Sequence, residues 1–159
     1  MAPIKLLQWF KTRREINKVA KLMNTPAAHA SKGSERWHEP TARKNIQTHI
    51  LSIGFKKSKM NSQLSNLILD LDHRVEKDGF KVIDEFLEQH KSTINKKELI
   101  SELKDAKQQI NLFVDNAKTH NIPQRKKETY TNVKSGINNL SNGPISYIDL
   151  IIDYLERKK

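Results

Sequence analysis

The densest group of side chains that could do chemistry is Asp70–Leu71–Asp72–His73, followed by Glu76. Carboxylates and imidazoles serve as metal ligands and as acid–base groups in many hydrolases. On a helix, Asp70 and His73 share one face, whereas Asp72 and Glu76 lie toward another side. We therefore interpret this group as a solvated helix face crossed by charge pairs, with metal binding or catalysis as the alternative.

The other residue types that carry chemistry show no recognised spacing. His38 and Glu39 with His49 give an H-E…H order, but two zinc ligands on one helical face should be four residues apart. Cysteine is absent, which excludes thiol nucleophiles, disulfides and cysteine-based metal sites. No nucleophile elbow or phosphate-binding glycine loop is present. We predict no catalytic residues, no metal site and no cofactor. A non-enzymatic protein is favoured, and an enzyme whose residues are scattered along the chain is the alternative.

Positive charge is concentrated in the first third of the chain. The formal net charge is +11 at pH 7. Residues 1–60 hold thirteen Lys and Arg against three acids, residues 61–119 hold nine against eleven, and residues 120–159 hold seven against four. A basic region of this kind suits an anionic partner, which can be nucleic acid, anionic lipid or an acidic protein surface. The alternative is a basic surface that only keeps the protein soluble.

The N-terminal segment combines basic and aromatic residues, as membrane-surface helices do. Trp9 and Phe10 stand beside Arg13 and Arg14 in this segment. On a helical wheel the apolar residues up to Phe10 spread over most of the circle, and the later ones occupy a different side. Because one continuous amphipathic face does not emerge, two short pieces packed on a bundle or a subunit are favoured over docking on a membrane, on nucleic acid or on another protein.

A second basic and aromatic run extends from Arg36 to Lys59. Arg43 and Lys44 fall in the first turn of an expected helix, where the macrodipole disfavours positive charge, and this placement is a hint of a binding role. Lysine and arginine clusters bind phosphates, and aromatic rings stack on bases, yet no named nucleic-acid motif is present. The candidate binding residues of the basic third are Trp9, Phe10, Arg13, Arg14, Arg36, Trp37, Arg43, Lys44, Lys56, Lys57 and Lys59.

The rest of the chain shows apolar residues at helical spacing. A helix with Thr41 as its cap should end near Gly54. Residues 61–90 should form helices with a break or kink at Asp78 and Gly79, and one continuous helix is the alternative. Asn95 and Glu98 form a capping-box-like pair before the clearest helix of the chain. That helix carries an a/d seam made of Leu99, Leu103, Ala106, Ile110, Phe113 and Ala117.

Two helices are expected after Pro123, which can open the first of them. The sequence Asn142–Gly143–Pro144 predicts a turn between the two. The apolar stripe of the first is Tyr130, Val133, Ile137 and Leu140, and that of the second is Ile145, Ile148, Ile152 and Leu155.

Together these patterns predict an all-α protein: a compact bundle of five to seven helices with a less regular basic N-terminal segment. The expected organisation is a basic helical segment over residues 1–23, a loop or linker over 24–40 and a helical bundle domain over 41–159. The oligomeric state stays open, because an a/d seam can face its own chain or another copy.

The first functional hypothesis is a helical interaction protein that binds another macromolecule, with a protein as the favoured partner, through its basic N-terminal third. Trp9, Phe10 and Trp37 are the expected anchors, because large aromatic residues dominate interface energetics. The alternatives are nucleic-acid binding through residues 1–60 and peripheral binding to anionic membranes. No apolar run approaches the roughly 20 residues that span a bilayer, and no signal peptide is evident. We expect a cytoplasmic location, with export without a cleaved signal as the alternative.

Overall fold

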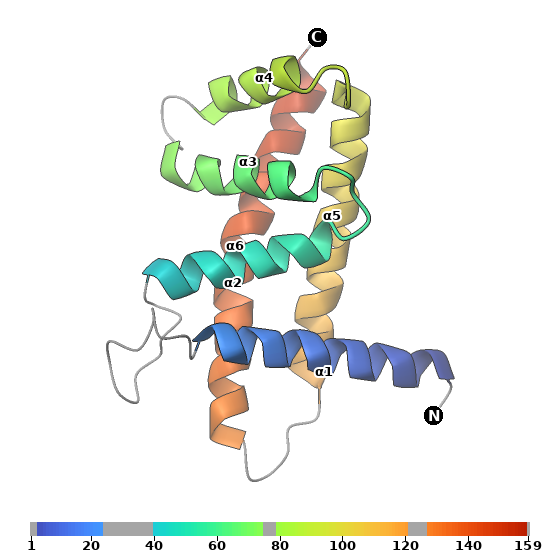
Figure 1. The fold of residues 1–159 in the computed structure, drawn as a ribbon, viewed down its shortest axis with the longest axis vertical. Helices are drawn as coiled ribbons and strands as arrows, with labels where there is room; N and C mark the ends of the chain where they lie inside the picture. The colour runs from blue at the N-terminus through green and yellow to red at the C-terminus, as the bar shows by residue number, and fades with distance from the viewer. Residues whose placement is uncertain (1–2, 24–39, 75–78, 121–126, 159) are drawn as a thin grey trace. The chain divides into compact units, whose positions relative to one another are not determined.

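All regular secondary structure among the described residues is α-helical. The computed structural model describes residues 3–23, 40–74, 79–120 and 127–158, and within them six helices and no strand are found (Figure 1). The predicted all-α class is therefore confirmed. The helices are α1 (Pro3–Met23), α2 (Pro40–Gly54), α3 (Asn61–Arg74), α4 (Gly79–Gln89), α5 (Lys96–Thr119) and α6 (Lys127–Arg157).

The chain divides into two compact units. Unit 1 consists of Met1–His49 and Asn111–Ser141, and unit 2 consists of Ile50–Ile110 and Asn142–Lys159. Helices α2, α5 and α6 each contribute residues to both units. Most of the segment expected to be a loop or linker, residues 24–39, lies outside the described part of the chain.

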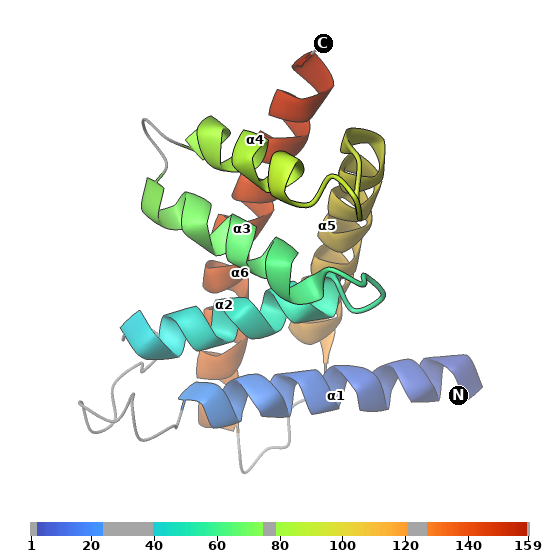
Figure 2. The same ribbon diagram turned by 45° about the horizontal axis from the view of Figure 1, so that its top comes forward.

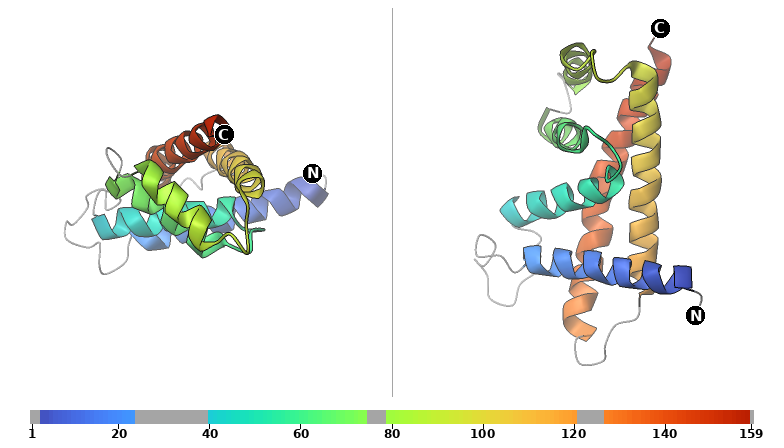
Figure 3. Two further views of the ribbon diagram at one scale, coloured as in Figure 1. Left: turned by 90° about the horizontal axis from the view of Figure 1, so that it is seen from above. Right: turned by 45° about the vertical axis from the view of Figure 1, so that its right-hand side comes forward.

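In unit 1, α1 lies across the C-terminal end of α5, as the views of Figure 1 and Figure 3 agree. The buried side chains of α1 follow one stripe at spacings of four, three and four residues, which is the pattern of a helix packed along one side. This helix is continuous over 21 residues, so the expected two short pieces are wrong. The stripe is Thr12, Ile16, Val19 and Met23.

Unit 2 contains α3 and α4, which lie side by side (Figure 2). The predicted break is confirmed, because α3 ends at Arg74 and α4 begins at Gly79, although Asp78 itself lies outside the described residues. The capping box that starts α5 is also confirmed: the Glu98 amide donates to Asn95 Oδ1 at 2.8 Å, and Asn95 Nδ2 donates to Glu98 Oε1 at 2.7 Å. All six residues of the predicted a/d seam of α5 are buried.

Gly54 ends α2 as predicted, at a point where the chain passes close to α5. A Cβ placed on Gly54 would lie 2.9 Å from Ile110 Cγ1, 3.0 Å from Ile110 Cδ1 and 3.0 Å from the Ala106 carbonyl oxygen. Real Cβ atoms essentially never come closer than 3.0 Å to such neighbours. The missing side chain therefore lets the end of α2 approach α5 within unit 2.

The expected turn at Asn142–Gly143–Pro144 is wrong, because α6 runs through it as one helix of 31 residues. Proline lacks the amide that would bond to the carbonyl four residues earlier, which is that of Leu140. Within unit 1 that carbonyl instead accepts a long hydrogen bond from Gln47 Nε2 at 3.4 Å. Pro144 is buried, so packing of the helix outweighs the local turn preference of these residues.

The apolar stripe of the second half of α6 differs from the expected one for the same reason. Ile148, Ile151 and Leu155 are buried, whereas Ile145 and Ile152 are only partly buried. With no turn, the helix keeps the register set by Val133 and Ile137, and the buried positions continue at spacings of three and four residues through Pro144.

A candidate interaction surface on helix α1

The indole of Trp9 is the centre of a ring cluster that joins α1 to the end of α5 in unit 1. Its ring stacks on the His120 imidazole, with centroids 5.0 Å apart and an interplanar angle of 29°. Phe10 meets it edge-on at 5.0 Å and 83°, and the Arg13 guanidinium carbon lies 5.5 Å from its centroid. Such ring and cation contacts fix a large side chain beyond simple burial. Trp9 is thus an anchor within its own unit.

His120 is buried beneath this cluster, with 6% of its surface exposed. Its Nε2 atom has no hydrogen-bond partner within the described residues. Burial lowers the pKa of His120 below its ordinary value, and the positive charges of Arg13 and Lys134 lower it further. The imidazole is therefore held neutral near pH 7, which suits a ring stacked on Trp9 between two cations.

Lys134 closes the C-terminal end of α5. Its Nζ donates to the carbonyl oxygens of His120 at 2.7 Å and Lys118 at 3.1 Å. These are carbonyls at a helix end that have no partner within the helix, so a lysine satisfies them and suits the macrodipole. Burial lowers the pKa of Lys134. The contact ties α6 to α5 next to the ring cluster.

The face of α1 turned away from the unit 1 core carries large apolar side chains. Leu7 is 70% exposed, Phe10 53% and Leu6 43%. Arg13 and Arg14 follow on the next turn, and a shallow depression runs between them. It is lined by Trp9, Phe10, Arg13, Arg14 and Asn17. A basic depression beside exposed apolar groups has the composition of a binding surface.

The charged residues of α1 are almost all positive. Six of its residues are Lys or Arg, and its only acid is Glu15. The Glu15 carboxylate lies 2.9 Å from His49 Nε2 on the side that faces α2. His49 is partly buried there. No ion pair with a described residue is formed by Arg14, Lys18 or Lys21, all of which are exposed.

The structure brings together only part of the predicted binding set. Trp9, Phe10, Arg13 and Arg14 form the α1 surface described above. Arg43 and Lys44 are exposed on the first turns of α2, whereas Arg36 and Trp37 lie outside the described residues, so those two remain predictions. The remaining three residues, Lys56, Lys57 and Lys59, are exposed in unit 2 between α2 and α3.

Lys57 has surroundings of mixed charge. It lines a groove with Glu102 and Asp105 of α5, and in the same groove Ser58 Oγ donates to Glu102 at 2.7 Å. These carboxylates offset the lysine charge, so this part of unit 2 is a weaker attractor of anions than α1.

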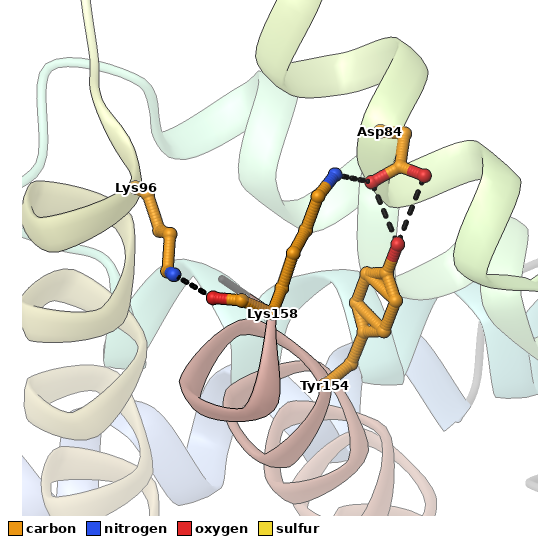
Figure 4. A network of polar contacts seen from close by, with 4 residues as sticks. All are labelled: Asp84, Lys96, Tyr154 and Lys158. Atoms are coloured by element: carbon orange, nitrogen blue, oxygen red, sulfur yellow. Dashed lines mark hydrogen bonds and ion pairs between the residues drawn. The ribbon is translucent and has the colours of Figure 1, made fainter.

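A polar network missed by the sequence analysis joins α4 to the end of α6 (Figure 4). Tyr154 donates its phenol proton to Asp84, with distances of 2.8 and 2.9 Å to the two carboxylate oxygens, and Lys158 Nζ lies 2.5 Å from Oδ1. Lys96 Nζ donates to the Lys158 carbonyl oxygen. Phe80 stacks on Tyr154 at 4.5 Å and 23°. The network holds three helices of unit 2 together.

The pKa shifts in this network follow from its contacts. The hydrogen bond from Lys158 lowers the pKa of Asp84, and the bond to Asp84 raises the pKa of Tyr154 and that of Lys158. Each shift stabilises the protonation state already present at pH 7. The network therefore has a structural role, and none of Asp84, Tyr154 and Lys158 is shifted toward exchanging a proton near pH 7.

No cluster of three or more histidines or acids placed to hold a metal ion is found in the described part of the chain. Asp70 is exposed on α3, whereas the side chains of Asp72 and His73 and the whole of Glu76 lie outside that part. The interpretation of Asp70, Asp72, His73 and Glu76 as a solvated helix face therefore stays a prediction. None of the described helices combines the length and the apolar character that a membrane span requires.

Comparison of the chain with protein-family models, with curated proteins and with solved structures gives no match.

Two features of the α1 surface were missed at the level of sequence. His120 and Lys134 belong to segments far from Trp9 along the chain, and neither carries a local motif. One signal was available: His120 directly follows the last turn of a strongly patterned helix, and the carbonyls at such a helix end need hydrogen-bond donors, a role that Lys134 fills. Its stacking on an N-terminal ring depends on the tertiary fold alone.

Proposed function

We propose that this chain is a non-enzymatic helical interaction protein that binds another protein through the outward face of α1. The observation that carries the proposal is the exposure of Leu6, Leu7 and Phe10 together on a helix whose opposite side is buried from Thr12 to Met23. Exposed leucine and phenylalanine side chains next to each other cost solvation free energy in the free protein, and binding a partner recovers it.

The ring cluster supports this proposal because it holds the surface in one arrangement. Trp9 is fixed by His120 below and Arg13 beside it, and Phe10 leans edge-on against it. A rigid aromatic anchor loses little side-chain entropy on binding, which is the property of interface hot spots. The absence of cysteine suits a cytoplasmic location, and we include that location in the proposal.

The proposal is tested by site-specific photo-crosslinking in cells that express the full chain. A photoreactive phenylalanine analogue replaces Leu7, and in a control protein it replaces Leu112, which is 48% exposed on α5 of the same unit. We expect discrete adducts from position 7 that are sensitive to protease and resistant to nuclease. Phe10→Ser should reduce them with no loss of helical circular dichroism, because Phe10 is half-exposed.

Equal adducts from positions 7 and 112 would mean that α1 has no special binding role. Nuclease-sensitive adducts from position 7 would contradict a protein partner and favour the nucleic-acid alternative. Adducts that extract with lipid solvent would favour the membrane alternative.

A further inference from the structure

Resting on the proposed function, we infer that the partner presents an acidic amphipathic helix that docks antiparallel along α1. The docking line is the outward stripe of α1, defined as its exposed residues at spacings of three, four, three and four. All five of its members are exposed. The outward stripe is Leu7, Phe10, Arg14, Asn17 and Lys21.

The spacing of the outward stripe is that of a helix–helix seam. Side chains at alternating intervals of three and four residues stay on one line of a helix and receive the side chains of a second helix between them. From Leu7 to Lys21 the line is about 21 Å long at 1.5 Å per residue, which corresponds to about four turns. A partner helix of similar length covers it.

The chemistry of the outward stripe changes along its length. Its N-terminal end is apolar, with Leu7 70% and Phe10 53% exposed and Leu6 beside them. Its C-terminal end is cationic, with Arg14 and Lys21 on the line. A complementary helix therefore needs apolar residues facing the first half and carboxylates facing the second.

The direction of the partner follows from helix electrostatics. Acidic residues are most favourable in the first turns of a helix, where the macrodipole is positive. In an antiparallel arrangement those turns lie beside the C-terminal half of α1, which holds Arg14, Lys18 and Lys21. The acidic N-terminal half and the apolar C-terminal half of the partner then each meet their complement.

A second copy of this chain does not fit the same line. In an antiparallel pair, Arg14 of one copy would face Arg14 of the other, and Lys21 would face Leu7. In a parallel pair, each cation would face its own equivalent. Either arrangement places like charges or an uncompensated charge against the seam, which is destabilising.

Neither a membrane nor nucleic acid suits the arrangement as well. A helix lying in a bilayer interface separates its apolar and charged faces, whereas Leu7 and Lys21 share one line here, so both would be pressed into the lipid. On nucleic acid the cations would meet phosphates, but Leu7 would have no apolar partner.

The test is a fluorescence anisotropy titration of the full chain with a labelled probe helix of about 18 residues, long enough for the line. The probe has glutamates on one face of its N-terminal half and leucines on the same face of its C-terminal half. We expect saturable binding that weakens about tenfold or more in Arg14→Glu with Lys21→Glu, and similarly in Phe10→Ser. Leu112→Ser, on another exposed surface, should leave binding unchanged.

A charge exchange completes the test. A probe with lysines in place of the glutamates should bind poorly to the natural chain and better to Arg14→Glu with Lys21→Glu. The inference is overturned if the acidic probe fails to bind, or if the lysine probe or a probe of reversed order binds equally well. It is also overturned if anionic vesicles or duplex DNA bind more tightly and depend on the same residues. Protease-sensitive adducts from position 7 would still uphold the proposed function in these cases.

Discussion

Replacing Gly54 by alanine should destabilise the protein, even though alanine is the better helix former. The added Cβ would lie 2.9 Å from Ile110 Cγ1 and 3.0 Å from the Ala106 carbonyl oxygen. Ile110 is fully buried and the carbonyl belongs to a helix backbone, so neither can move aside cheaply. Overpacking of this kind costs about 1–3 kcal/mol, and the alanine preference returns about 0.5–1 kcal/mol. We expect a net loss of about 1 kcal/mol.

The assay is urea unfolding followed by far-ultraviolet circular dichroism, because neither tryptophan belongs to unit 2. In a thermal scan, a loss of this size should lower the melting temperature by about 2–4 °C in a chain of this length. Ile110→Ala is the matched background, since it removes both isoleucine atoms that the new Cβ would meet. In that background Gly54→Ala should cost about 1 kcal/mol less. An unchanged or raised unfolding midpoint, or the same cost in both backgrounds, would refute the close-approach reasoning.

Three further predictions concern individual contacts. The native pKa of His120 lies below its unfolded value of roughly 6.5, so its stabilising effect is complete above that value and is lost as the pH falls toward the native pKa. In a Trp37→Phe protein the fluorescence of Trp9 should therefore change, and the free energy of unfolding should fall, as the pH drops below about 6.5. His120→Gln should remove that dependence, and a profile that stays the same would contradict the stacked neutral ring. Asn95→Ala should cost about 1 kcal/mol in urea unfolding by removing the cap of α5, and a change within error would contradict the capping role. Asp84→Asn should lower the unfolding midpoint at pH 7 by removing the ion pair with Lys158. The effect should be small, because this ion pair is exposed and screened by salt. The lowered pKa of Asp84 means that this difference should disappear in acid, and a difference that persists there would refute the ionic contribution.

Elements specified by neighbouring residues could be predicted from the sequence. The capping box of Asn95 and Glu98 depends on contacts within three residues, and the seam of α5 is visible as a local repeat of apolar residues; both are present. The same holds for the end of α2 at Gly54. In each case several neighbouring residues favour the same structure, so the prediction does not depend on the conformational preference of one residue.

Features that depend on competition between local preference and packing could not be predicted. The residues before and at Pro144 favour a turn, yet the buried line from Ile137 to Ile148 holds one helix through them. In α1 the wheel of all apolar residues is dispersed because Leu7 and Phe10 do not belong to the core at all. A wheel cannot distinguish an apolar residue that is packed from one that is left exposed.

The candidate site was predicted in part. Trp9, Phe10, Arg13 and Arg14 were selected by composition, and they do lie together because they occupy two adjacent turns of one helix. Their support by His120 and Lys134 is a long-range contact without a sequence motif. Lys56, Lys57 and Lys59 belong to the other unit, and Lys57 lines a groove with acids, which charge counting along the chain does not show.

The hydrogen bond from Gln47 to the Leu140 carbonyl has an evolutionary consequence. A proline at position 144 is tolerable only where something else donates to the carbonyl it leaves unpaired. Positions 47 and 144 should therefore vary together in related sequences: an apolar residue at 47 should accompany a residue other than proline at 144. Where 144 is not proline, position 47 is released from this requirement and should drift toward the residue types common on half-buried helix surfaces.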